Sequence, residues 1–113
     1  MEGTLCHFEI PGKDVKATGE FYSKIFGWKM DDSYPNYLMF NTGKEPGGGI
    51  EKREPFSNGV MIYIQVNDII ETLDTVKASG GTVIKEKTEI PNVGHFGLFD
   101  DIDGNTIGIF QSK

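Results

Sequence analysis

The sequence contains a single cysteine, Cys6, in 113 residues. One thiol cannot form an intramolecular disulfide, so a disulfide-stabilised secreted domain is excluded and Cys6 is expected to be a small buried apolar side chain. Hydrophobic runs long enough to span a bilayer and the features of a signal peptide are missing too. These absences predict a cytoplasmic protein that has no membrane partner.

Positive charge is also scarce, because 11 basic residues against 17 acidic ones leave a net charge of −6. Nucleic acids and anionic membranes are bound by concentrated Lys and Arg, and no basic run occurs here, so neither is expected as a partner. The hydrophobic fraction of 37% is typical of a globular chain. A chain of this length is expected to form one domain, residues 1–113, with a core of modest size.

What the sequence does contain is an internal repeat at an offset of 54 residues, the difference between Asp14 and Asp68. Each Asp follows an alternating strand pattern and precedes an amphipathic helix pattern that ends at glycine. Three further strands are expected after each helix, so the predicted order is βαβββ twice. We therefore predict an α+β domain of two modules, at about residues 1–55 and 56–113, sharing one core.

Helix ends are predicted from capping residues, and strands from alternation. The first helix is expected from its N-cap Asp14 to about Phe26, and the second from Asp68 to about Ser79. The apolar stripe predicted on the first helix consists of Val15, Thr18, Tyr22, Ile25 and Phe26, with Phe21 beside it. The predicted strands are residues 4–10, 28–30, 37–41, 47–53, 60–66, 82–85, 95–99 and 106–111, and a linker at 55–59 separates the modules.

Several phrases in this order resemble the vicinal oxygen chelate superfamily, also called the glyoxalase/bleomycin-resistance/dioxygenase fold. They are HFEIP at residues 7–11, FYSKIFGW at 21–28, VNDI at 66–69 and DGN at 103–105, and they extend over essentially the whole chain. The resemblance implies a curved mixed sheet, in which each module forms a half-barrel with its helix on the convex side. The concave faces would form a cup for a small molecule. The resemblance also implies a homodimer, since half-barrels leave strand edges that need covering.

In metal-using members of this family, a divalent ion is held by side chains of the first and last strands of each module, typically two His and two Glu. The resemblance places His7 at one of these positions, and Met61, Gly49 and Gly108 at the other three. One imidazole does not hold a divalent ion tightly without further ligands. A divalent metal is therefore disfavoured, and His7 is the one ligand that would remain for it.

His7 keeps two interpretations. It is either a partly buried, hydrogen-bonded side chain in a protein that has lost the metal, or a relic ligand or general base, because imidazole titrates near neutral pH. The first interpretation is favoured. The residues expected to line the cup are His7, Glu9, Gly49, Glu51, Met61, Tyr63 and Gly108, with His95 at the rim.

Three other patterns give no indication of a functional site. The aromatic residues of FYSKIFGW are interpreted as core rather than as a platform for a ligand. The run at residues 100–104 lacks the spacing of an EF-hand, and the three glycines at 47–49 are not followed by the Gly-Lys-Ser/Thr of a P-loop.

The predicted function is binding of a small molecule of unknown identity in the cup. The alternative is a metal-dependent lyase or isomerase of the glyoxalase type that uses His7 as ligand or base. A third hypothesis is a structural module without a ligand. Whether the chain is an enzyme stays open at this point, because a shared fold does not transfer chemistry.

Overall fold

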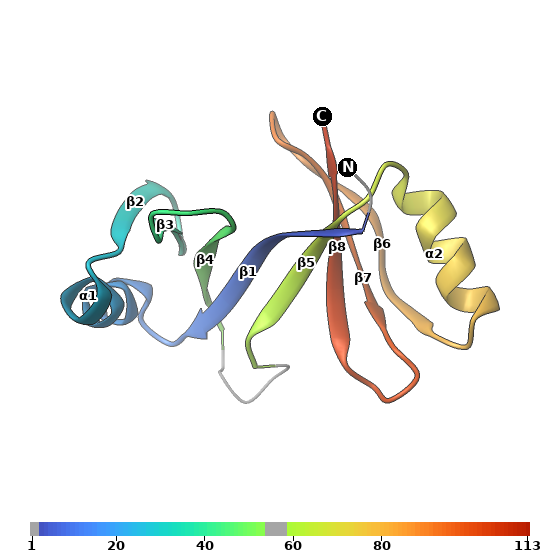
Figure 1. Cartoon of the computed structure of the whole chain (residues 1–113), viewed down its shortest axis with the longest axis horizontal. Coiled ribbons are helices and arrows are strands. Elements are labelled where there is room, and N and C mark those ends of the chain that lie inside the picture. Colours follow the sequence, from blue (N-terminus) through green and yellow to red (C-terminus); the bar gives the residue numbers. More distant parts are fainter. Residues whose placement is uncertain (1–2, 54–58) are drawn as a thin grey trace. The chain divides into compact units, whose positions relative to one another are not determined.

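The computed structural model describes residues 3–53 and 59–113, and in them a strand, a helix and three further strands follow one another twice (Figure 1). This order confirms the predicted α+β class and the twofold βαβββ pattern. The elements are β1 (Thr4–Gly12), α1 (Val15–Phe26), β2 (Lys29–Tyr34), β3 (Tyr37–Asn41), β4 (Gly47–Lys52), β5 (Met61–Gln65), α2 (Ile69–Ala78), β6 (Thr82–Ile90), β7 (Gly94–Asp100) and β8 (Thr106–Ser112).

The chain divides into two compact units, which are described one at a time. The first unit is His7–Met61, and the second consists of Met1–Cys6 together with Ile62–Lys113. Strand β1 therefore contributes residues to both units. The predicted boundary between modules, at about residues 55 and 56, lies outside the described residues. In the described part of the chain, no helix is both long and apolar enough to cross a bilayer.

In the first unit the strands lie in the order β2-β3-β4-β1, with β1 and β4 parallel and the other neighbours antiparallel. The core on one side of this sheet consists of Leu38, Phe40 and Ile50, which are buried. Trp28 stacks on Phe40 with ring centroids 4.6 Å apart, and on Tyr22 of α1 at 5.2 Å. These contacts attach α1 to the apolar side of the sheet, so α1 does not cover the opposite side.

Helix α1 begins where the sequence predicts. The side chain of Asp14 accepts a hydrogen bond from the backbone N–H of Ala17 at 3.1 Å, and Gly27 ends the helix at a φ of 73°. Replacing Asp14 by Ala leaves that N–H without its partner, and we expect it to lower the free energy of unfolding by about 1 kcal/mol, measured by urea denaturation. Asp32→Ala, an exposed aspartate outside the helices, is the matched control and is expected to change stability little.

One part of the helix prediction is wrong. Ile25 and Phe26, expected in the buried stripe, have 53% and 62% of their surface exposed, and Phe21 has 57%. The reason is that α1 meets the sheet along Gly19, where a Cβ would overlap the side chain of Leu38. This close approach covers only the middle of a wide apolar arc, so the flank that carries Phe21 and Ile25 is left in solvent.

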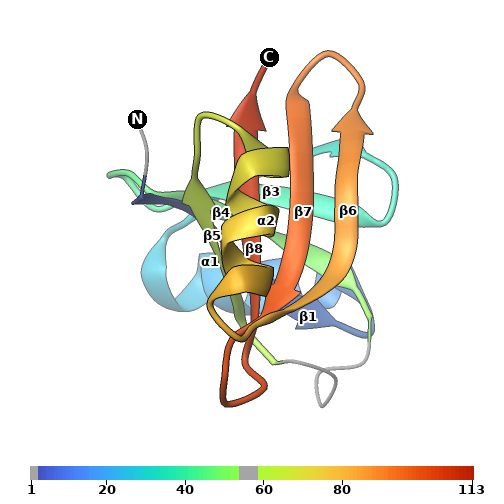
Figure 2. The ribbon, with the colours of Figure 1, turned by 90° about the vertical axis from the view of Figure 1, so that its right-hand side faces the viewer.

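In the second unit the strands lie in the order β5-β8-β7-β6, with β5 and β8 parallel and the rest antiparallel. Figure 2 looks onto α2, which contacts β6, β7 and β8. The core between them consists of Val66, Ile69, Leu73 and Ile109. Strand β6 is longer than predicted, since its polar second half pairs with β7 beyond a register shift between Lys85 and Thr88.

Candidate functional site

Strand alternation gives the first unit a second, polar side. Phe8 and Ile10 of β1 pack on the core, so His7 and Glu9 lie on the opposite side. Gly49 of β4 is the partner of both Glu9 and Met39, and Glu51 is the partner of Tyr37. We call this side the polar face. It consists of His7, Glu9, Tyr37, Met39, Gly49 and Glu51, and Arg53 follows it just after β4.

His7 is paired on this face with Tyr37. The Nε2 atom of His7 lies 2.8 Å from the Tyr37 hydroxyl oxygen, and the two rings are nearly parallel with centroids 6.4 Å apart. Burial lowers the pKa of His7 below its ordinary value of 6.5, so the imidazole is neutral at neutral pH. A neutral imidazole can both donate and accept a hydrogen bond, which suits it to a polar contact with a ligand.

Glu9 is the most unusual residue of the polar face. It carries a carboxyl group, yet only 4% of its surface is exposed. Burial above all, and then the charge and a hydrogen bond of Glu51, raise its pKa from 4.5 to about 7, although a hydrogen bond with Tyr37 and the charge of Arg53 act in the opposite direction. Groups whose pKa is shifted to near neutral pH are frequent at functional sites.

Arg53 supplies the positive charge beside this carboxyl. Its Nη2 atom lies 3.7 Å from Oε1 of Glu9, and its Nε donates to Oε1 of Glu51 at 2.9 Å. Arg53 is itself anchored, since its backbone N–H donates to the carbonyl of Gly12 and its Nη2 to the carbonyl of Gly59, each at 3.0 Å. The guanidinium group is therefore held in place against the two carboxyl groups.

Tyr37 and Arg53 are site residues that sequence reasoning missed. Tyr37 alternates with the core residues Leu38 and Phe40 along β3, and this alternation alone is a signal that it lies on the polar side. Nothing in the sequence marks Arg53, because its approach to Glu9 depends on the parallel pairing of β1 with β4.

Tyrosine rings cover Gly49 and Gly108, the two glycines at expected metal-ligand positions. A Cβ at Gly49 would overlap the ring of Tyr37, and a Cβ at Gly108 would overlap the ring of Tyr63, its partner across β5 and β8. Each ring thus covers the place where a side chain at the glycine would begin. Both positions were expected to carry Glu in a metal-binding protein, and a phenol ring lies there instead.

His95 does not share the face of Tyr63 and Gly108. It alternates with Gly97, where a Cβ would lie 3.2 Å from Cγ2 of Ile69, so His95 lies on the side of β7 that faces α2. The predicted rim position is corrected accordingly. Its Nδ1 atom is buried without a hydrogen-bond partner among the described residues. Met61, the remaining predicted position, begins β5 and is 6% exposed.

The residues present do not fit a divalent metal ion. Within residues 3–53 and 59–113, no group of three His, Cys, Asp or Glu side chains is arranged to hold one. His7 is already paired with a phenol, and the two positions expected for carboxylates are glycines covered by Tyr37 and Tyr63.

The sequence matches the family described as the Glyoxalase/Bleomycin resistance protein/Dioxygenase superfamily over residues 4–109. A "Glyoxylase-like domain-containing protein" of Didymella fabae is 32% identical over 96% of this chain and 94% of its own length. A "Probable lactoylglutathione lyase" of Vibrio cholerae is 28% identical over 96% of this chain and 91% of its own length. CFP32 of Mycobacterium bovis is also 28% identical, over 99% of this chain and 47% of its own length, so the chain spans about half of that relative.

Among solved structures, methylmalonyl-CoA epimerase from Mycobacterium tuberculosis has a TM-score of 0.75 at 13% identity, covering 97% of this chain and 88% of its own. A glyoxalase/bleomycin resistance protein/dioxygenase superfamily member from Vibrio splendidus has a TM-score of 0.70 at 17% identity, covering 96% of this chain and 100% of its own. At such identities these likenesses show a shared fold.

Proposed function

We propose that this chain, which belongs to the Glyoxalase/Bleomycin resistance protein/Dioxygenase superfamily as its sequence motifs predicted, binds a small polar molecule at the polar face without a divalent metal ion. The observation that supports this best is Glu9. Burying a carboxyl group costs stability, and Glu9 is buried on the side of the sheet that faces away from the core. A binding role gives a reason to keep it there.

The polar face offers a ligand several hydrogen-bonding groups close together. His7 and the Tyr37 hydroxyl can each donate or accept, Glu9 can do either according to its protonation, and Arg53 only donates. This mixture suits a ligand that carries both donors and acceptors, such as a carbonyl or carboxyl group next to a hydroxyl. At Gly49 a ligand would meet the ring of Tyr37, which covers the glycine on this side.

A second candidate function is acid–base catalysis by a lyase or isomerase, and the pKa of Glu9, about 7, favours it. A carboxyl with that pKa can accept a proton from a ligand and return it near neutral pH. Tyr37 links Glu9 to His7, so a proton could be held at either end of this chain of hydrogen bonds. The glyoxalase-type names of the curated relatives point in the same direction.

Binding is expected to be independent of metal. After incubation with Zn, Ni, Mn, Fe(II) and Mg followed by desalting, elemental analysis should find no retained ion in the wild type or in His7→Ala, because the donor set is incomplete. Retention of nearly one ion per chain that is lost in His7→Ala would contradict this, and the metal-dependent lyase or isomerase hypothesis would then lead.

The ligand site is tested by NMR titration in EDTA, with S-lactoylglutathione and methylmalonyl-CoA as probes taken from the names of relatives. We expect amide shifts at His7, Glu9 and residues 47–49, and weaker binding in Glu9→Gln and Tyr37→Phe. Tyr22→Phe, which removes a hydroxyl on the opposite side of the same sheet, is the matched control. Shifts confined to the second unit, or no shifts with either probe, would count against the proposal and favour a module without a ligand at this face.

A further inference from the structure

The exposed flank of α1 is an apolar row. Ala17, Phe21 and Ile25 follow one another at intervals of four residues, so they form one ridge along the helix. Phe21 is 57% exposed and Ile25 53% exposed. Two large apolar side chains left in solvent on the same ridge are unfavourable for an isolated molecule, and they indicate a surface that a partner covers. We call Ala17, Phe21 and Ile25 the α1 ridge.

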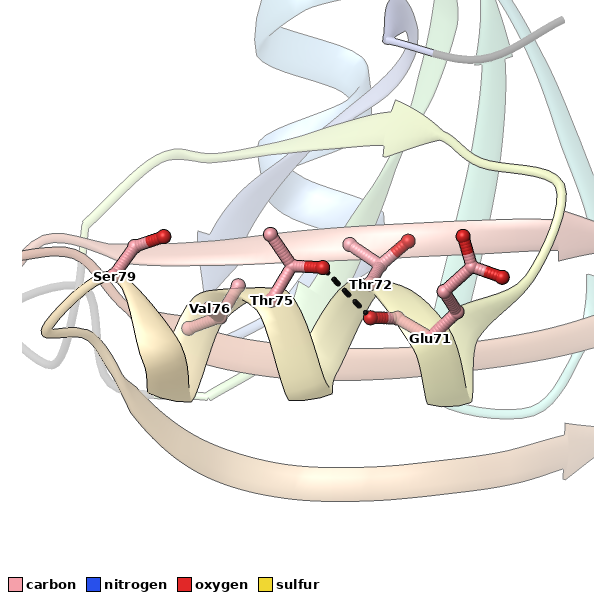
Figure 3. A pocket seen from close by; sticks show the side chains of 5 residues that line it. All are labelled: Glu71, Thr72, Thr75, Val76 and Ser79. Carbon is pink, nitrogen blue, oxygen red and sulfur yellow. Dashed lines mark hydrogen bonds between the residues drawn. The ribbon is translucent and has the colours of Figure 1, made fainter.

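Helix α2 carries a hollow instead. Its volume is about 310 Å³, and Figure 3 shows the five lining side chains rising from the same side of the helix. They belong to two rows with intervals of four residues, which are Glu71, Thr75 and Ser79 in one and Thr72 and Val76 in the other. All of them except Glu71 are short side chains, so the space between the rows forms a groove, which we call the α2 groove.

The threonines of the α2 groove need no polar occupant. The hydroxyl of Thr72 donates to the carbonyl of Asp68 at 2.8 Å, and the hydroxyl of Thr75 donates to the carbonyl of Glu71 at 3.1 Å, the bond drawn in Figure 3. The hydrogen of each hydroxyl is thus donated within the helix. An apolar occupant would not leave these donors unsatisfied.

The internal repeat relates the ridge to the groove. At the offset of 54 residues that places Asp14 on Asp68, Phe21 corresponds to Thr75 and Ile25 to Ser79. The same flank of the two equivalent helices is therefore bulky in the first unit and hollow in the second. The two surfaces have complementary shapes at equivalent positions.

We propose that the α1 ridge of one copy of this chain packs into the α2 groove of a second copy. Ridges at intervals of four residues that enter grooves between rows of the same interval are the commonest way in which helices pack, with axes crossing at about −50°. One charge pair agrees with this pairing, because Lys24 lies in the last turn of α1 beside the ridge and Glu71 in the first turn of α2 borders the groove, whereas Glu20 places a negative charge beside the ridge as well. The contact supplies a surface for the homodimer that the sequence predicted.

The proposal is tested by sedimentation velocity over a range from low to high micromolar protein. The wild type is expected to associate with rising concentration, while Phe21→Glu, which charges the ridge, and Thr75→Trp, which fills the groove, remain monomeric. Mixing the two variants should restore association, because the Phe21→Glu chain keeps its groove and the Thr75→Trp chain keeps its ridge. Dimers and larger assemblies of the wild type both support the contact, since a ridge and a groove are different surfaces.

Matched controls separate the contact from general effects. Ile102→Glu makes the same kind of change at an apolar residue that is 77% exposed and lies outside both surfaces, and it should associate like the wild type. Thermal melts show which variants are folded, and Ile25→Glu or Ser79→Trp replaces any that is not. A wild type that stays monomeric throughout, variants that associate unchanged, or a mixture that fails to recover association would each overturn the proposal.

Discussion

Replacing Glu9 by Gln is expected to stabilise the protein at pH 8, by up to about 3 kcal/mol relative to the wild type. The carboxyl of Glu9 has an ordinary pKa of 4.5 in the unfolded chain and a pKa of about 7 in the folded protein. A shift of that size, at about 1.4 kcal/mol per pKa unit, corresponds to about 3 kcal/mol of destabilisation once both states are ionised. Glutamine keeps the shape and carries no charge to bury.

The pH dependence follows from the same shift. Between pH 4.5 and about 7 the folded protein holds a proton on Glu9 that the unfolded chain has lost, so the contribution of this group to stability falls as pH rises through that window. Below the window both states are protonated, and above it both are ionised, so the contribution is constant on either side. The difference between wild type and Glu9→Gln should therefore be small at pH 4.5 and largest at pH 8.

Urea denaturation at both pH values measures this difference. Glu20→Gln removes the same charge at an exposed position of α1 and is the matched control. If Glu9→Gln were less stable than the wild type at pH 8, the ionised carboxyl would be stabilised by Arg53 and Tyr37 more than burial destabilises it. A binding role would then not be needed to explain why Glu9 is retained.

Introducing a single methyl group at Gly49 is expected to destabilise the protein by about 1–3 kcal/mol, as overpacking in a filled interior does. A Cβ at this position would overlap the ring of Tyr37, which cannot move without leaving His7. The sign of the effect is informative, because replacing Gly by Ala in a strand would otherwise be favourable by roughly 0.5–1 kcal/mol.

A double-mutant cycle measures this coupling. In Tyr37→Ala the ring is gone, so adding Gly49→Ala should cost nothing or stabilise, and the two changes should be strongly non-additive. Tyr37→Phe, which keeps the ring and removes only the hydroxyl, is the control and should leave Gly49→Ala as destabilising as before. Additive effects would show that the ring of Tyr37 does not hold the position that we assign to it.

Local patterns in the sequence were sufficient to predict the helices and strands and about half of the residues on the polar face. Asp14 and Asp68 cap helices because a short acceptor side chain next to a helical pattern has one favoured role, and alternation placed His7 and Glu9 on the side opposite Phe8. These inferences need only neighbouring residues.

The features that the sequence did not predict depend on contacts between distant parts of the chain. The approach of Arg53 to Glu9 follows from the parallel register of β1 and β4, which no local pattern specifies. The exposure of Ile25 has the same origin, because the width of the helix face that the sheet covers is decided by the contact of Gly19 with Leu38. Predicting the side on which His95 lies would have required the contact of Gly97 with Ile69.

The hydroxyl of Tyr37 has one hydrogen to donate, and it lies between His7 and Glu9. When Glu9 is ionised, that hydrogen points to the carboxylate, so Nε2 of His7 must carry the hydrogen of the ring. When Glu9 is protonated, its carboxyl donates to Glu51 instead, so the Tyr37 hydroxyl can donate to a bare Nε2 and the ring hydrogen resides on Nδ1. The tautomer of His7 thus reports the charge of a carboxyl that it does not touch, and ¹⁵N chemical shifts of the imidazole should change in step with the titration of Glu9.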